Sequence, residues 1–266
     1  MTLEERMKQY EYVSRHYLTR RTPVIIRIDG RAFHSFTRGF ERPFDEVLVR
    51  SMQRTMKYLC ENIQGCVLGY TQSDEITLVL IDYQNLDSSA WFDNNIQKLC
   101  SISASIATMA FNRFFAEEVK NYAYNMERDP ETGCLDPQQF KQHAVYIKAI
   151  DKGAMFDSRA FNIPKEEVAN VLFWRQDDAS KNSIQMVGQA NFSHKELQHK
   201  SRSDIQDMLM LQKNINWNNY PTHLKRGSCC VRKFDDTINR TKWVVDTEIP
   251  IFKGEGRSYI EDLIFV

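Results

Sequence analysis

The stretch "GYTQSDEITLVL", residues 69–80, decides the fold because it predicts a β-hairpin with two acids at its tip. The β-rich segments "CVLGYTQ" and "EITLVLI" flank the polar turn pair Ser73 and Asp74. Acidic residues at such a tip are often only solvated turn residues. Asp74 and Glu75 therefore need a partner from elsewhere in the chain if they are to form a site.

The segments around this hairpin alternate between strand and helix patterns. An apolar run that ends at "DG" is typical of a buried strand meeting a turn. Apolar side chains at helical spacing, after the start signals Pro43 and Asp45, predict a helix. In chain order we expect a strand at 23–29, a helix at 45–62, strands at 66–72 and 75–81, a helix at about 89–119 and a strand at 143–150.

This β-α-β-β-α-β order is the split βαβ pattern of ferredoxin-like domains, an α+β fold. The topology makes the first and third strands the central pair of the sheet. The end of the first strand, Asp29, is then expected near the start of the third, at Asp74 and Glu75. Asp29 is the partner that the hairpin acids require.

The second half of the chain is less regular. Helices are predicted over 164–192 and near 201–214, and short strands with loops from about 215 onward. Residues 129–137 read as a polar loop. Because no repeat, low-complexity tract or linker is evident, we expect a first domain at 1–150 and a mostly helical extension at 151–266 that packs on it and completes it.

Composition excludes several classes of protein. No unbroken apolar run approaches the roughly 20 residues of a membrane span, and the charged start "MTLEERMKQYEYVSR" does not resemble a signal peptide. We expect a cytoplasmic protein without a membrane partner. The six cysteines form no CxxC pair, which argues against a zinc site or a disulfide framework.

Charge is balanced overall but unevenly distributed. The chain holds 35 Lys and Arg against 35 Asp and Glu. From Phe192 to Lys242 there are ten basic residues against five acidic ones, a local excess of five. Such a region can neutralise phosphates, or it can be an ordinary solvated surface, and charge alone does not decide between the two.

Converging carboxylates at strand ends suit Mg²⁺, which prefers hard oxygen ligands. Two such ions about 4 Å apart can activate a hydroxyl and stabilise a departing phosphate. Asp29 and Asp74 would be the bridging ligands, with the Gly30 carbonyl as a further one. Groups fit to hold a triphosphate surround them: Arg27, Arg31, His34, Arg42 and the hydroxyl of Ser73. Taken alone, Asp29-Gly30 is more typical of a plain turn than of a metal site.

The segments "IIRIDGRAFHSFTRGFERPFDE" and "GYTQSDEITLVL" closely resemble the tRNA-His guanylyltransferase family of 3′–5′ polymerases. Further on, "FDSRAFNIP", "FWRQDDASKNSIQM", "FSHKEL" and "INWNNYPTHLKRG" resemble the guanylyltransferase-like branch of that family. The resemblance runs from about residue 5 to 255.

The resemblance implies a polymerase-type palm domain that extends RNA at its 5′ end. A tRNA 5′-monophosphate is first activated with ATP, and the 3′-hydroxyl of an incoming nucleoside triphosphate, commonly GTP, then attacks it. Asp29 and Asp74 would hold two Mg²⁺ ions together with the Gly30 carbonyl, and Glu75 would be a supporting catalytic acid. The nucleotide-binding residues would be Arg27, Asp29, Gly30, Arg31, Ala32, Phe33, His34, Arg42, Ser73, Asp74 and Asn182. A homotetramer or homodimer is also implied.

Two departures from the family pattern bear on the substrate. After Trp-Arg-Gln, the eukaryotic members carry His-Ile-Asn-Asn-Leu-Tyr-Asn, whereas this chain reads "SKNSIQM" and keeps Asn182. Arg42 stands where the family usually has lysine. The first departure favours template-directed repair of 5′-truncated tRNAs over addition of an extra guanosine to tRNA-His. A palm-type nucleotide cyclase and a non-catalytic RNA-binding protein remain as alternatives.

Contacts to tRNA are expected from basic residues of the second half: Arg175, Lys181, Lys195, Lys225 and Arg226. In the alternative interpretation, "WRQDDASKN" is a helix surface with Trp174 packed inward, and Arg175, Lys181 and Asn182 lie on one polar face as salt-bridge or solvent-exposed groups.

Overall fold

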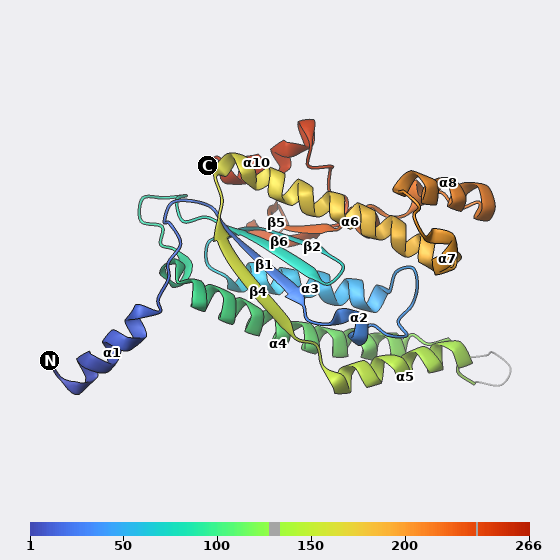
Figure 1. Ribbon diagram of the computed structural model, residues 1–266, viewed down its shortest axis with the longest axis horizontal. Helices are drawn as coiled ribbons and strands as arrows, with labels where there is room; N and C mark the ends of the chain where they lie inside the picture. Colours follow the sequence, from blue (N-terminus) through green and yellow to red (C-terminus); the bar gives the residue numbers. More distant parts are fainter. Residues whose placement is uncertain (128–133, 238) are drawn as a thin grey trace.

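The computed structural model describes residues 1–127, 134–237 and 239–266, and a six-stranded antiparallel sheet forms its centre (Figure 1). The strand order is β4-β1-β3-β2-β5-β6. The strands are β1 (Val24–Gly30), β2 (Cys66–Gln72), β3 (Glu75–Leu80), β4 (Phe156–Asn162), β5 (Ser228–Asp235) and β6 (Arg240–Asp246).

Helices cover both faces of this sheet. The α-helices are α1 (Leu3–Val13), α2 (Phe33–Phe36), α3 (Glu46–Asn62), α4 (Ile96–Tyr124), α5 (Pro137–Lys152), α6 (Val168–Asn191), α7 (His194–Leu197), α8 (Arg202–Lys213), α9 (Thr222–Arg226) and α10 (Ser258–Ile264). Short 3-10 turns lie at Trp91–Asn94, Lys165–Glu167, Trp217–Asn219 and Gly254–Arg257. Helices α3 and α4 lie on one side of the sheet and α6 on the other, while α1 projects from the body (Figure 1).

Alternation along the strands builds two cores. Successive side chains of a strand point to opposite faces, so Ile26 packs with Met56 and Phe111 on the side of α3 and α4. Its neighbour Ile25 packs with Leu172 and other residues on the side of α6 and α10. The sheet is thus buried on both faces near its centre.

The predicted palm topology is confirmed. Strand β1 lies between β3 and β4, so the first and third strands are neighbours as expected. Strands β5 and β6 extend the same sheet beyond β2, and α6 and α10 pack on its face. The C-terminal extension therefore packs on the palm, as predicted. The division at residue 150 stays a prediction.

The predicted strand at 143–150 is wrong, because these residues belong to α5. The last strand of the predicted β-α-β-β-α-β order is instead β4, Phe156–Asn162. Helix α5 has the start signals that mark a helix: Asp136 caps it and Pro137 opens it. Tyr146 and Ala149 are its buried residues, and their spacing of three is helical.

Helix α4 is long and apolar enough to cross a membrane by length and composition alone. It qualifies although the sequence holds no unbroken apolar run of that length. In the fold, its Leu99, Phe111, Phe115 and Val119 are buried in the core beneath the sheet. The core helix of a soluble domain passes the same test, so the finding is weak evidence for a membrane.

Candidate active site

The hairpin tip and the end of β1 meet at one point of the sheet. Gln72 pairs with Glu75 across the turn, which leaves Ser73 and Asp74 as the two turn residues. Ser73 adopts a left-handed φ of 50°, and its hydroxyl donates to the Asp74 carboxylate at 3.0 Å. The Gly30 N–H donates to the Asp74 carbonyl at 3.1 Å, and Asp29 is the direct cross-strand neighbour of Glu75. The predicted convergence of Asp29 and Asp74 is therefore present in the backbone.

A cavity of about 730 Å³ opens beside these residues. It is walled by the end of β1, the loop from 32 to 45, the hairpin tip and two residues of α6, Met186 and Gln189. Eight of the predicted nucleotide-binding residues line it: Asp29, Gly30, Ala32, Phe33, His34, Arg42, Ser73 and Asp74. The space and the polar lining suit a nucleotide.

The other three predicted nucleotide-binding residues lie outside this cavity. Asn182 lines a small adjoining recess of about 80 Å³ that also contains Ser73. The exposed guanidinium of Arg31 lies 3.9 Å from the Met155 sulfur. Arg27 is on the face of β1 turned toward α6, against the ring of Trp174.

Acidic and basic side chains both surround Asp29. Its cross-strand neighbours are Glu75 on β3 and Asp157 on β4. Burial, followed by the charges of these two acids, raises the pKa of Asp29, while Arg159 and Arg27 act in the opposite direction. Burial likewise raises the pKa of Asp74, and the nearby Asp29 and Glu75 add to it. Like charges placed opposite each other on a sheet repel, and Glu75 and Asp157 are each balanced by a paired arginine.

Asp157 was missed by sequence reasoning. Its segment "FDSRAFNIP" was noted only for its resemblance to the family, because residues 143–150 occupied the last strand of the predicted sheet. With β4 placed at Phe156–Asn162, the register puts Asp157 opposite Asp29. The side chain is exposed and pairs with Arg159 at 3.3 Å.

Glu75 is occupied by arginines. The Arg175 Nε and Nη2 donate to its two carboxylate oxygens, each at 2.7 Å, and Arg27 Nη2 donates to Oε2 at 3.0 Å. Glu75 is only 5% exposed. A carboxylate held by such a fork is well placed to fix the hairpin and poorly placed to bind a metal. The role of Glu75 as a supporting catalytic acid stays a prediction.

The alternative interpretation is wrong about Trp174, which does not pack inward, but right that Arg175 can be a salt-bridge group. Trp174 is 53% exposed, whereas Arg175 is 7% exposed and points to Glu75. Burying the Glu75 carboxylate without a cationic partner would cost more free energy than leaving the Trp174 ring exposed. Arg175 is therefore inside the protein, without the exposed polar face expected for a tRNA contact.

The remaining predicted tRNA contacts differ in exposure. Lys225 is 9% exposed and its Nζ donates to the Asn218 carbonyl, so its expected place on an RNA-facing surface is wrong. Burial lowers the pKa of this lysine. Lys181 and Lys195 are exposed, and Lys181 pairs with Asp177 at 2.7 Å. Arg226 is partly exposed.

Gly30 and Phe33 shape the floor of the cavity. A Cβ built on Gly30 would lie 2.2 Å from a carbon of the Phe33 ring, which real contacts do not allow. That ring is buried among Phe36, Phe111 and Phe156. Phe33 thus serves packing as well as lining the cavity, and glycine is required at position 30 by the close approach of the ring.

The donor set fits Mg²⁺ better than a metal held by protein ligands alone. No group of three or more His, Cys, Asp and Glu suited to a metal occurs among residues 1–127, 134–237 and 239–266. Mg²⁺ usually takes one or two carboxylates together with waters and substrate phosphates. Asp29, Asp74 and the Gly30 carbonyl supply that kind of set beside a nucleotide-sized cavity.

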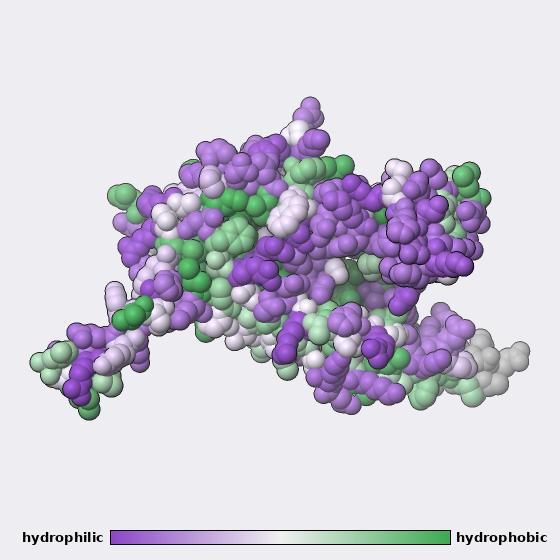
Figure 2. Space-filling model, in the orientation of Figure 1, coloured by the Kyte–Doolittle hydropathy of each residue, from purple (hydrophilic) through white to green (hydrophobic). Residues whose placement is uncertain are grey.

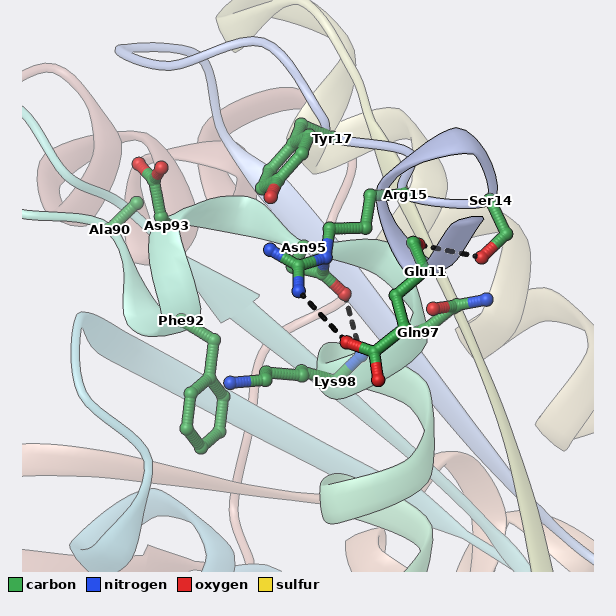
Figure 3. A pocket seen from close by; sticks show the side chains of 10 residues that line it. All are labelled: Glu11, Ser14, Arg15, Tyr17, Ala90, Phe92, Asp93, Asn95, Gln97 and Lys98. Atoms are coloured by element: carbon green, nitrogen blue, oxygen red, sulfur yellow. Dashed lines mark hydrogen bonds and ion pairs between the residues drawn. The ribbon is translucent and has the colours of Figure 1, made fainter. Parts of the chain in front are cut away.

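A second large cavity, of about 760 Å³, lies at the other end of the molecule (Figure 3). It is formed by the end of α1, the turn at Trp91–Asn94 and the start of α4. Lys98 lies against the ring of Phe92, and Arg15 pairs with Glu11 at 3.7 Å (Figure 3). None of the predicted site residues lines this cavity.

Comparisons with known proteins identify related sequences and structures. A family profile described as tRNAHis guanylyltransferase matches residues 4–164, more than half of the chain. A bacterial tRNA(His) guanylyltransferase (Thg1)-like protein solved in complex with ATP is similar, with a TM-score of 0.81, 42% identity and 99% of both chains covered. A bacterial Thg1-like protein solved in complex with GTP gives a TM-score of 0.78 at 39% identity, again over 99% of both chains.

Curated relatives are more distant in sequence. A probable tRNA(His) guanylyltransferase of Dictyostelium discoideum is 27% identical over 270 residues, which cover 95% of this chain and 91% of that one. The uncharacterized protein R259 of Acanthamoeba polyphaga mimivirus is 27% identical over 268 residues, covering 93% and 83% respectively. The similarity therefore extends well beyond the profile match.

Proposed function

The chain belongs to the tRNAHis guanylyltransferase family of nucleotidyltransferases, and on that premise we propose that it repairs 5′-truncated tRNAs with Mg²⁺, ATP and GTP. The observation that carries the proposal is the convergence of Asp29 and Asp74 at the mouth of the 730 Å³ cavity. Addition is template-directed and runs in the 3′–5′ direction.

Two displacements at phosphorus make up the reaction. In the first, an oxygen of the RNA 5′-monophosphate attacks the α-phosphorus of ATP, and pyrophosphate leaves. In the second, the 3′-hydroxyl of GTP attacks the activated 5′-phosphorus, and AMP leaves. Both reactions need an attacking oxygen and a leaving group held in line.

The residues of the chain divide this work. Asp29, Asp74 and the Gly30 carbonyl would hold Mg²⁺, which when bound activates the attacking oxygen and neutralises charge on the leaving group. His34 and Arg42 line the same cavity, within the space that a triphosphate would fill. Glu75 accepts hydrogen bonds from Arg175 and Arg27, and these bonds hold the hairpin tip beside β1.

Repair is favoured over addition of an extra guanosine to tRNA-His by the "SKNSIQM" segment. In this segment Ser183 is buried and accepts a hydrogen bond from the Trp217 indole at 3.0 Å. It is thus engaged in packing α6 against the turn at Trp217–Asn219. Asn182 is exposed beside the recess that adjoins the cavity.

The test is an incorporation assay with two RNAs. The protein is incubated with Mg²⁺, ATP and labelled GTP, and either a tRNA that lacks its first 5′ nucleotide opposite a cytidine or an intact tRNA-His. We expect label at the 5′ end of the truncated tRNA, and much less on tRNA-His. Preference for intact tRNA-His would replace repair by guanosine addition, and a cyclic product formed from GTP without RNA would indicate the nucleotide cyclase.

A further inference from the structure

A third cavity, of about 540 Å³, adjoins the catalytic one. The two cavities share Arg42 and Gln189, so they meet along one wall. The new cavity continues from there along the end of α6 to α7, where it is lined by Gln185, His194, Gln198 and His199. We call it the acceptor groove. The surface is hollowed between the part formed by α7 and α8 and the part formed by α5 (Figure 2).

The two cavities differ in chemistry. Asp29, Glu41, Asp45 and Asp74 line the catalytic cavity, whereas among the residues that the structure describes no Asp or Glu lines the acceptor groove. The polar groups of the groove are one guanidinium, two imidazoles and three carboxamides, with Phe192 and Leu197 as apolar walls. Such groups donate hydrogen bonds to phosphate and sugar oxygens. The carboxylates of the catalytic cavity repel a phosphate group unless Mg²⁺ is bound there. The acceptor groove can bind a phosphate group without a metal.

Local structure keeps the groove free of acid. Glu196 on α7 folds back into a capping box, where it accepts from the Ser193 N–H at 2.8 Å and from its hydroxyl at 2.6 Å. Gln185 and Gln189 are four residues apart on α6, so their carboxamides lie on the same side of the helix. The groove thus presents a row of donors that begins at the wall of the catalytic cavity.

We propose that the acceptor groove binds the sugar-phosphate backbone of the RNA next to its reacting 5′ end, while the nucleoside triphosphate occupies the catalytic cavity. The inference rests on the proposed function, since the reacting phosphate must lie at Asp29 and Asp74. The nucleotides that follow it need a path outward, and the acid-free groove provides one. A polynucleotide chain fits this continuous path better than a free triphosphate, which belongs beside the metal ligands.

The test inserts one negative charge without a change of shape. Gln185 lines the groove but not the catalytic cavity, so Gln185→Glu replaces a donor by an acid there. Gln198→Glu is a second groove variant at an exposed position. The matched control is Gln97→Glu in the distant cavity, which carries the same charge change (Figure 3).

Binding of a fluorescent 5′-monophosphorylated tRNA is measured by anisotropy, and KM values for tRNA and for GTP are measured by incorporation. We expect both groove variants to weaken tRNA binding about tenfold and to raise KM for tRNA, with KM for GTP within twofold of wild type. The control should match wild type in every measurement. Melting temperatures verify that all three variants fold.

Unchanged tRNA binding in both groove variants overturns the inference. A raised KM for GTP with normal tRNA binding also overturns it, and assigns the groove to a free triphosphate. The binding measurement is independent of turnover. If wild type binds tRNA but incorporates nothing, the proposed function fails, while the contrast between groove variants and control still decides the inference.

Discussion

Arg175 decides how the acids of the site are arranged. Its guanidinium spans both oxygens of Glu75, and Arg27 adds a third hydrogen bond. With Glu75 paired to two arginines, Asp29 and Asp74 are the carboxylates that line the cavity at the end of β1 and at the hairpin tip. Glu75 therefore stabilises the hairpin, whereas Asp29 and Asp74 face the space where substrate would bind.

We expect Arg175→Met to lower the free energy of unfolding by about 3–5 kcal/mol, because it leaves a charged carboxylate buried without its main partner. Denaturant unfolding at pH 7 measures the loss. The double variant Arg175→Met with Glu75→Gln removes the uncompensated charge and should recover part of it. A single variant within 1 kcal/mol of wild type would mean that the fork contributes little to stability.

Gly30 provides a second prediction at this scale. The added methyl of Gly30→Ala must displace the Phe33 ring from its cluster, since the Cβ would lie 2.2 Å from it. We expect the free energy of unfolding to fall by about 1–3 kcal/mol, as at other overpacked sites. We expect the rate of nucleotide incorporation to fall by more than this loss of stability explains. Combining the change with Phe33→Leu should restore stability in part. Full activity in Gly30→Ala would contradict the close packing of this floor.

The sequence predicted Asp29 and Asp74 correctly as neighbours because the topology rule alone brings the two strand ends together. It could not orient Trp174 and Arg175. Adjacent residues of a helix point in different directions, and apolarity favours Trp174 for the core. The need of Glu75 for a buried cation outweighs that preference, and this need becomes visible only when α6 is placed over β3.

At the scale of elements, the start of α3 is fixed by its N-cap residue, Asp45. Asp45 caps the helix by accepting from the Leu48 N–H at 2.9 Å, and it also accepts from the Glu41 N–H and the Tyr146 hydroxyl. These bonds join α3, the loop before it and α5 at the edge of the catalytic cavity. Burial raises the pKa of Asp45, and the hydrogen bonds oppose that rise.

We expect Asp45→Ala to cost more than an ordinary helix cap, which contributes about 1 kcal/mol. The additional loss comes from the Tyr146 hydroxyl, which is left buried without its acceptor. Ser201→Ala removes the exposed cap of α8 and is the matched control. Chemical denaturation of the two variants measures the difference. Equal losses would show that the bond to Tyr146 does not stabilise the fold.

Helix α5 marks where element prediction failed. "HAVYIKAI" is short and apolar, so periodicity alone cannot distinguish a strand from a buried helix segment. The cap Asp136 and the first-turn Pro137 were available as start signals, but they followed a polar loop and were assigned to it. Residues 129–133 of that predicted loop lie outside the described structure.

At the scale of the molecule, one sheet joins the two halves of the chain. The order β4-β1-β3-β2-β5-β6 combines three strands from before residue 150 with three from after it. The pairing of β2 with β5 is long-range, and the sequence pattern gave only short strands and loops for this region. Packing of the C-terminal half on the palm was predictable from the lack of a linker, whereas its strand pairing was not.

The homotetramer or homodimer implied by the family resemblance is a prediction for the whole molecule. Helix α1 buries none of its residues in a single chain and exposes Leu3, Met7 and Tyr10 (Figure 1). Apolar side chains on an isolated helix are typical of an interaction surface. Light scattering coupled to size exclusion should give two or four times the mass of one chain. The mass of a single chain would contradict the prediction.

The central claim is that Asp29 and Asp74 together catalyse transfer to an RNA 5′ end. Its most direct test is single-turnover incorporation of labelled GTP into 5′-truncated tRNA by wild type, Asp29→Asn and Asp74→Asn, with tRNA binding measured in parallel. We predict that each asparagine variant loses at least about a thousandfold in rate, corresponding to about 4 kcal/mol of transition-state stabilisation, while still binding tRNA. Incorporation by either variant at a rate near that of wild type would contradict the account.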